Sequence, residues 1–452
     1  MKLLHGPAAA GLAALLLAAI GPTLHAGADA PYGIPARIEP KRCLNMPALA
    51  TGTMPKRLSQ TGAFVDTAHM TPSNGLIPYD LVVAFWSDGA QKSRWLALPE
   101  GKIDYSATGE WKFPACTVFV KNFDLPTDAR KPELMRRLET RLLVRDSAGG
   151  VYGVTYKWRP DGSDADLLTA AKTENVPITA ADGTVHQQTW YYPSPKDCLT
   201  CHTANAGLVL GVKARQLNRD FKYPSGTVDN ELRAWNHIGL FKQSLNEADL
   251  QKIPTLAAAD DKSRSIEDRA RSYLDANCSQ CHRPHGTVAS FDARFETPPD
   301  KQLLVDGPVL IDERVDKPRV IAPHDIWRSI AYMRVNTNDD IRMPPLARET
   351  IDQKGVLLLN DWIMSLPGRS VVPPPSLTTR NDASGKSIEV TLTEAEPGAE
   401  IHYTLDGSTP GNSDPLYAKP IKIDATTVVR ARAYKEGFTR SIIAQQIFTI
   451  GQ

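Results

Sequence analysis

Two short segments of the chain combine cysteine and histidine at a spacing that can hold one cofactor. Residues 198–202 read Cys-Leu-Thr-Cys-His, and residues 278–282 read Cys-Ser-Gln-Cys-His. Two thiols three positions apart can both form thioethers to the vinyl groups of one porphyrin, while the adjacent imidazole reaches its iron. The pattern predicts two covalently bound haem c groups. The expected thioether residues are Cys198, Cys201, Cys278 and Cys281, and the expected proximal ligands are His202 and His282.

Two other kinds of site use paired cysteines, namely a thioredoxin-like redox couple and a zinc site. A redox couple belongs near a βαβ pattern, and a structural zinc site has its four ligands in one short segment. Here each cysteine pair has its own histidine attached, and the two copies lie far apart in the chain. The haem interpretation is therefore favoured over both.

The distal ligand of the second haem is predicted to be Met343. It lies in the segment Arg-Met-Pro-Pro at 342–345, where the prolines fix φ and remove backbone donors, so the thioether is held in a stiff loop. Met333 and Met364 fall at apolar positions of expected helices and are interpreted as core residues. A His/Met pair raises the reduction potential, which suits an electron carrier.

The first haem has no methionine between His202 and Met333. Its distal ligand is therefore a histidine, a lysine, a methionine from the N-terminal region such as Met70, or absent. His237, in Trp-Asn-His-Ile-Gly, is the leading candidate because it lies among apolar residues at a suitable distance along the chain. The alternative for such a residue is a packed, hydrogen-bonded histidine. An absent ligand would leave the iron open to a small molecule.

The second motif follows the pattern of an amphipathic helix. Ser265 and Asp268 resemble a capping box, and an apolar stripe then runs to Cys278. A closing helix is expected over 352–366, where Gly355 would let two helices cross closely, and a third helix is expected over 323–335. These patterns predict a central all-α class I cytochrome c domain, assigned to residues 261–370.

The remaining chain reads mainly as β structure. Short alternating runs predict an N-terminal β-sandwich-like domain over 31–197, and residues 138–144 and 152–158 form the best hairpin candidate. Two prolines before the first motif make a leading helix improbable, so a first haem-binding segment over 198–260 is expected to sit against the β domain. Further strands are expected at 81–86, 93–98, 111–123 and 186–192.

The C-terminal part begins with three prolines at 373–375 and continues with alternating apolar residues at 388–392, 401–405 and 429–433. This pattern predicts an Ig-like β-sandwich over 371–452. The predicted fold class is therefore multidomain α+β.

The N-terminus predicts export. Residues 1–30 contain Lys2, an apolar run too short to span a bilayer, and an Ala-Asp-Ala cleavage site, which together are typical of a signal peptide. Periplasmic localisation and no integral membrane segment after cleavage are expected.

Cys43 and Cys116 are the two cysteines outside the motifs, and they form either a disulfide or two free thiols. Lys plus Arg number 52 and Asp plus Glu number 51, so the charge excludes a basic footprint for nucleic acid.

The stretch from about 58 to 366 resembles a family of bacterial periplasmic dihaem c-type cytochromes, which also occurs fused to quinoprotein glucose/sorbosone-type dehydrogenases. The matching phrases, besides both Cys-X-X-Cys-His motifs, are 75–80, 86–89, 137–141, 156–158, 217–220 and 342–345. The resemblance implies transfer of electrons from a partner dehydrogenase to a respiratory acceptor such as a terminal oxidase or another cytochrome. No dehydrogenase is fused here, so the donor would be a separate protein, and Cys116 stands where a small residue is expected.

The tail from about 388 to 450 resembles the Ig-like domain at the C-terminus of chitobiases, through residues 401–410 and 433–437. That resemblance implies a fold rather than carbohydrate binding. The leading functional prediction is an electron carrier with no catalytic residue assigned. The alternatives are a peroxidase-like oxidoreductase that reacts at the first haem and, more weakly, a tail that attaches the cytochrome to a surface or glycan.

Overall fold

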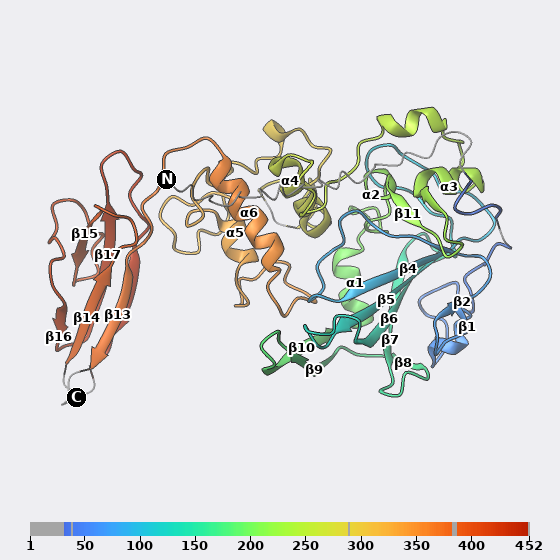
Figure 1. Ribbon diagram of the computed structural model, residues 1–452, viewed down its shortest axis with the longest axis horizontal. Coiled ribbons are helices and arrows are strands. Elements are labelled where there is room, and N and C mark those ends of the chain that lie inside the picture. The colour runs from blue at the N-terminus through green and yellow to red at the C-terminus, as the bar shows by residue number, and fades with distance from the viewer. Residues whose placement is uncertain (1–30, 38, 288–289, 382–386, 451–452) are drawn as a thin grey trace, which may run out of the picture.

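The computed structural model of the protein describes residues 31–37, 39–287, 290–381 and 387–450. The expected signal peptide, residues 1–30, lies outside the described residues. Figure 1 shows a large strand-rich region at one end of the molecule, short helices α4 to α6 in the middle and a separate group of strands at the other end. Within the described ranges, no helix combines the length and apolar character needed to cross a membrane.

One antiparallel sheet organises the N-terminal half, with strand order β3-β4-β5-β6-β7-β8. The predicted hairpin is confirmed, because Leu142 lies opposite Val154 and Val144 opposite Tyr152. Gly149, with φ of 94°, supplies the turn between them. The strands are β3 (Leu76–Pro78), β4 (Gln91–Ala97), β5 (Val118–Pro126), β6 (Met135–Arg145), β7 (Val151–Trp158) and β8 (Ala165–Leu168).

Both faces of this sheet are buried, but by loops, short helices and two-stranded sheets rather than by a second large sheet. One face packs on the chain before β3, with Leu58 and Phe64 in its core, and the other packs on the chain after the first Cys-X-X-Cys-His motif, with Leu217 and Trp235 in its core. The expected β-sandwich-like arrangement is therefore wrong. The helices on the second face are α2 (Ala214–Leu217), α3 (Glu231–His237) and the 3-10 helix η2 (Glu247–Lys252).

Small two-stranded sheets complete this half. They pair β1 (Phe64–Asp66) with β2 (Thr71–Pro72), β9 (Lys172–Thr179) with β10 (Val185–Tyr192), and β11 (Asp220–Lys222) with β12 (Val228–Asn230), and the 3-10 helix η1 (Leu58–Gln60) precedes β1. Residues 81–86 are irregular rather than a strand, and the strand expected from 111 begins only at Val118. In both places apolar residues are buried by loops, so alternation did not mark a strand.

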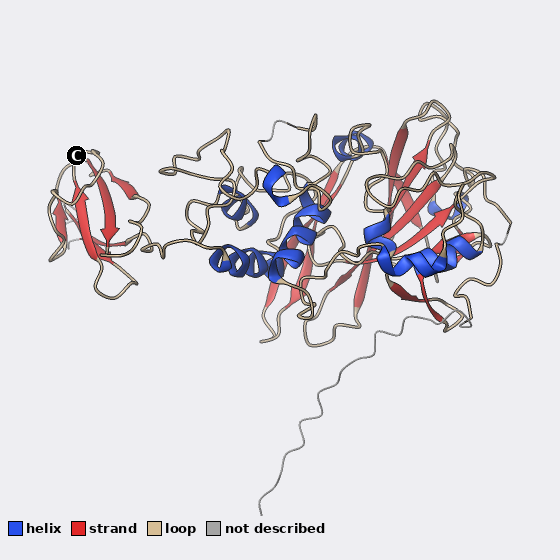
Figure 2. Cartoon of the chain, turned by 90° about the horizontal axis from the view of Figure 1, so that it is seen from above, coloured by secondary structure: helices blue, strands red, loops and turns tan. Residues whose placement is uncertain are grey.

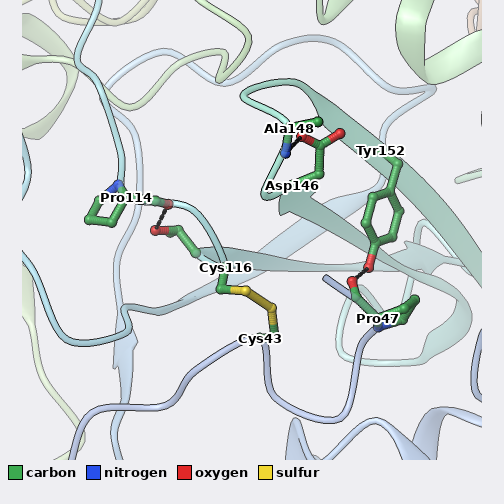
Figure 3. Close-up of a disulfide and its surroundings, with 8 residues drawn as sticks. Cys43, Pro47, Pro114, Cys116, Asp146, Ala148 and Tyr152 are labelled. Atoms are coloured by element: carbon green, nitrogen blue, oxygen red, sulfur yellow. Dashed lines mark hydrogen bonds between the residues drawn. A yellow bond between two sulfur atoms is a disulfide. The ribbon is translucent and has the colours of Figure 1, made fainter. Parts of the chain in front are cut away.

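The two leftover cysteines form a disulfide (Figure 3). The Cys43 N–H donates to the Cys116 carbonyl at 3.0 Å, and the hydroxyl of Tyr152 in β7 donates to the Pro47 carbonyl nearby. The bond fastens the N-terminal segment to the chain that enters β5, across 73 residues of sequence.

The central region is not an all-α domain, and the prediction of a class I cytochrome c fold is wrong. Its helices are α4 (Ile266–Cys278), α5 (Ile330–Val335) and α6 (Gln353–Ser365), with the 3-10 helix η3 (Pro299–Lys301), and long irregular segments separate them. The helix expected over 323–335 forms only in its last part. The Asp325 carboxylate accepts the N–H groups of Trp327 and Arg328, both at 3.0 Å, and thereby stabilises a turn in place of helix.

The two expected helices α4 and α6 are confirmed, and each begins at a capping side chain. The Ser265 hydroxyl accepts the Asp268 N–H at 3.0 Å, and the Asp352 carboxylate accepts the Gly355 N–H at 3.1 Å. The helices cross closely at Gly355, where a Cβ would lie 2.4 Å from the Tyr273 ring. This contact is the role that the sequence predicted for the glycine.

The C-terminal region is the predicted Ig-like β-sandwich, seen at one end in Figure 2. One sheet holds β13 (Ser376–Asn381), β14 (Ile388–Thr393) and β16 (Ile421–Ile423), and the other holds β15 (Glu400–Thr404), β17 (Thr427–Tyr434) and β18 (Ala444–Phe448). Asp316 of the central region pairs with Arg432 of this sandwich at 2.8 Å. Arg328 donates to the Ser441 carbonyl at 3.1 Å, so the sandwich contacts the central region through polar groups.

Candidate haem-binding sites

The first motif lies at the end of strand β10, in the short helix α1 (Pro195–Cys201). As expected, strand β10 rather than an amphipathic helix leads into the motif, but Pro195 does not exclude helix: it begins the short helix that holds both cysteines, because proline is well tolerated at the first helical position, where no N–H is needed. Ser194 and Asp197 cap the helix reciprocally, with the Asp197 carboxylate accepting the Ser194 N–H at 2.8 Å. The helix places Cys198 and Cys201 one turn apart and ends at His202.

The His202 ring is oriented by a backbone carbonyl. Its Nδ1 donates to the Leu208 carbonyl at 2.7 Å, which leaves Nε2 as the acceptor of the neutral ring. Burial lowers the pKa of His202 to about 4, so the imidazole is neutral near pH 7. Axial histidines of metal centres have this arrangement, with one nitrogen on a hydrogen-bond partner and the other free for the metal.

A cavity of about 220 Å³ lies between α1 and the sheet. Cys198, Cys201 and His202 line it, and most of the remaining wall is apolar. Gly153 of β7 permits the approach of α1, since a Cβ there would lie 2.5 Å from the Cys198 sulfur and 2.8 Å from its Cβ. Sequence reasoning missed this residue, although a glycine inside an alternating strand is a signal of close backbone approach.

The second motif begins at the last residue of α4. The His282 ring stacks on Phe291, with centroids 4.4 Å apart, and burial lowers its pKa to about 4. Its buried Nδ1 has no hydrogen-bond partner among the described residues. A second cavity of about 110 Å³ is lined by Cys278, His282 and Met343 together with apolar side chains. The structure therefore brings three of the four predicted residues of this site to one cavity, whereas Cys281 is not among its lining residues.

Met343 lies in a loop that is fixed by backbone hydrogen bonds. Its N–H donates to the Arg334 carbonyl at 2.9 Å, and its carbonyl accepts from the Arg348 guanidinium at 3.2 Å. Arg348 is only 1% exposed and also donates to the Val335 carbonyl at 2.7 Å. The same arginine thus connects the methionine loop to the end of α5.

The two motifs lie side by side, which the sequence did not indicate. The thiols of Cys201 and Cys281 lie close enough to shift each other's pKa, which is raised for Cys201 and lowered to about 7 for Cys281. The buried Arg283 reinforces the contact, because it donates to the Asn205 carbonyl at 3.2 Å and pairs with Glu110 at 2.9 Å. Residues from α4 and the second motif also line the first cavity.

The phrase Trp-Ser-Asp-Gly at 86–89 joins the sheet region to the second site. The Asp88 carboxylate accepts the N–H groups of Glu349 and Thr350 at 2.9 and 2.8 Å, just beyond the Met343 loop. The Trp86 N–H donates to Asn277 of α4 at 2.8 Å. The sequence analysis used this phrase only for the family resemblance, and its contacts identify it as a junction between the sheet region and the second site.

His237 does not lie at the first cavity. Its exposed ring stacks on Tyr32 at 3.5 Å, and its Nε2 is 3.0 Å from the Pro35 carbonyl. Met70 packs on the opposite side of the sheet, in the cluster that contains Leu58. Met364 is 36% exposed rather than a core residue, and neither it nor Met333 lines the second cavity.

The donor set fits haem better than a bare metal ion. Among the residues that the structure describes, no three or more His, Cys, Asp or Glu side chains form a group that could hold a metal ion. A haem iron needs only one or two protein ligands, because the porphyrin supplies four nitrogens. The first cavity offers the oriented imidazole of His202 and the thiols of Cys198 and Cys201. The second offers the unpartnered imidazole of His282 and the thiol of Cys278. The walls of both cavities are mainly apolar.

Comparison with known families identifies the C-terminal region. Residues 382–445 match the Chitobiase/beta-hexosaminidase C-terminal domain, which agrees with the sandwich of β13 to β18. The match covers the tail and neither cysteine motif. No curated protein was found to match the chain.

Proposed function

We propose that the protein is an exported dihaem electron carrier, with haem c attached at 198–202 and 278–282. The observation that supports it most directly is the proximity of the two motifs, whose histidines His202 and His282 line separate cavities. A pair of unrelated zinc or thiol sites would have no need of this proximity. When bound, each haem supplies a one-electron Fe(III)/Fe(II) couple.

The chain's own residues hold and tune these groups. The four motif thiols bind the porphyrins covalently, and His202 and His282 provide proximal nitrogens. Met343 provides a thioether across the second cavity, which favours the reduced iron and raises its potential. The apolar walls exclude water, which also shifts the potential and limits side reactions.

The arrangement favours direct transfer of electrons between the two haems. In this proposal Cys201 and Cys281 would each hold a different porphyrin through one thioether, and their proximity would place the two attachment sites next to each other. Electron tunnelling falls steeply with distance, and no intermediate carrier is then required.

The proposed setting is the periplasm, with a dehydrogenase as donor and a terminal oxidase or another cytochrome as acceptor. The disulfide between Cys43 and Cys116 supports an oxidising compartment. The choice of a quinoprotein dehydrogenase as donor rests on the family resemblance of residues 58–366 alone.

Intact-protein mass spectrometry tests the proposal. The full chain is produced in a bacterial host that completes c-type haem attachment, and the expected mass corresponds to two added haems. Cys201→Ala and Cys281→Ala are each expected to reduce the stoichiometry or change the attachment of one haem only. A wild-type mass without added porphyrin would refute the proposal.

A peroxidase-like reaction at the first haem is the second candidate. It is favoured by one observation, because the described lining of the first cavity contains no methionine and no histidine besides His202. This alternative predicts a high-spin first haem and turnover with peroxide. The carrier predicts two low-spin haems and no turnover.

A further inference from the structure

We propose that Lys121 is the distal ligand of the iron in the first haem. The inference rests on the proposed attachment of haem at Cys198 and Cys201, and it concerns the ligand that the sequence left open. Lys121 lies on β5 and lines the same cavity as His202. It replaces His237, which lies elsewhere.

The other nitrogen donors at this cavity are unsuitable or already engaged. Arg141 and Arg283 keep their protons and offer no lone pair to a metal. The amine of Lys213 is held by the buried carboxylate of Asp275, at 2.8 and 2.9 Å to its two oxygens. Among the described lining residues outside the motif, Lys121 is the one remaining side chain with an amine that can bind iron.

Lys121 differs from its neighbours in lacking an anionic partner. It lies directly between Arg94 on β4 and Arg141 on β6, in register with both. Arg94 pairs with Asp80, and Arg141 pairs with Glu139. For Lys121, no hydrogen-bond or ion-pair partner occurs in the described parts of the chain, and its amine lies over the Phe123 ring at 4.8 Å.

The surroundings also favour the neutral amine. Burial, followed by the charges of Arg94, Lys92 and Arg141, lowers the pKa of Lys121 well below its usual value, and the opposing charge of Glu139 offsets this only in part. A neutral amine has the free lone pair that coordination requires, and lysine loses its proton readily in such a site. Coordination of iron by the neutral amine would therefore explain why a lysine without an ion-pair partner lies between Arg94 and Arg141.

Two properties of the oxidised holoprotein test the inference, namely its electron paramagnetic resonance spectrum and its near-infrared magnetic circular dichroism. The expected wild-type spectra show two low-spin haems, with the charge-transfer bands of one His/Lys and one His/Met pair. Lys121→Arg keeps the charge but removes the ligand, so the first haem should become high-spin and the second should stay unchanged.

Lys92→Arg is the matched control, because Lys92 is a half-buried lysine on the same face of the sheet that donates to the Phe85 carbonyl at 3.1 Å and does not line the cavity. It should leave both haem signals as they are. Lys121→Met provides a second variant, which should convert the His/Lys band into a second His/Met band.

Three results would overturn the assignment. The first is a wild-type spectrum without a His/Lys band, which by itself requires no variant to fold. The second is an unchanged spectrum in Lys121→Arg, as expected if the lysine instead pairs with a haem propionate. The third is loss of the low-spin signal in Lys213→Arg but not in Lys121→Arg. Because mass spectrometry reports two attached haems independently, each of these results leaves the proposed function standing.

Discussion

Replacement of Gly153 by alanine should impair the first haem site while leaving the second intact. The added Cβ would lie 2.5 Å from the Cys198 sulfur and 2.8 Å from the Cys198 Cβ, so α1 has to move away from β7. Overpacking of this kind costs about 1–3 kcal/mol. Alanine recovers about 0.5–1 kcal/mol relative to glycine in a strand, because glycine loses more backbone freedom on folding. The free energy of unfolding should therefore fall by about 1 kcal/mol.

The effect on haem attachment should exceed the effect on stability. A free Cys198 side chain can rotate away from the new methyl group, but a sulfur bound to porphyrin cannot. In intact-protein mass spectra of Gly153→Ala, we expect a larger fraction of molecules with one haem. Denaturant unfolding supplies the stability change.

Gly411→Ala is the control for Gly153→Ala. At Gly411 the added Cβ would lie 3.7 Å from Asp414, an ordinary contact, so stability should be equal to or slightly above that of the wild type. If Gly153→Ala retains two haems in wild-type proportion and unfolds no more easily than the wild type, the close approach of α1 to β7 is not what the site requires.

Three further predictions follow from other contacts. Met343→Ala should lower the reduction potential of one haem in a redox titration and leave the other nearly unchanged, and two unmoved potentials would exclude Met343 as a ligand. Replacing Cys43 and Cys116 with serine should lower the free energy of unfolding by up to about 4 kcal/mol, from the closure of a loop of 73 residues, and equal denaturation midpoints would contradict this. Asp88→Ala leaves the N–H groups of Glu349 and Thr350 unpaired, and the free energy of unfolding should fall by about 1–3 kcal/mol for each N–H that water does not reach. Asp88→Asn keeps an acceptor oxygen, so thermal unfolding should show a smaller loss of stability.

Local patterns predicted the elements whose stability depends on residues close in sequence. The β6–β7 hairpin, the N-cap of α4, the extent of α6 and the C-terminal sandwich were all predicted correctly. Gly355 was also correctly interpreted, because a glycine on the apolar face of an amphipathic helix indicates close packing against a neighbouring element.

The errors arose where distant contacts or capping overrode a local signal. His237 has apolar neighbours in sequence, but Trp235 and Ile238 are buried in the core against the sheet, whereas the imidazole of His237 is exposed. Pro195 was interpreted as a helix breaker, yet it begins α1. The expected all-α domain is instead built largely from loops. Arg271 of α4 holds one of them, because it donates to the carbonyls of Phe295 and Thr297 at 2.8 and 2.9 Å. Such side-chain contacts to irregular backbone leave no periodic pattern.

The contact between Cys201 and Cys281 also constrains biosynthesis. Before the prosthetic groups are added, an oxidant that reaches these neighbouring sulfurs can join them to each other, and that cross-link would block ligation at both motifs. Thiol–disulfide exchange proceeds through a thiolate, and Cys281 is the more acidic member of the pair. If haem is attached as proposed, the polypeptide must therefore receive its porphyrins before the two segments close upon each other, or be kept reduced until then.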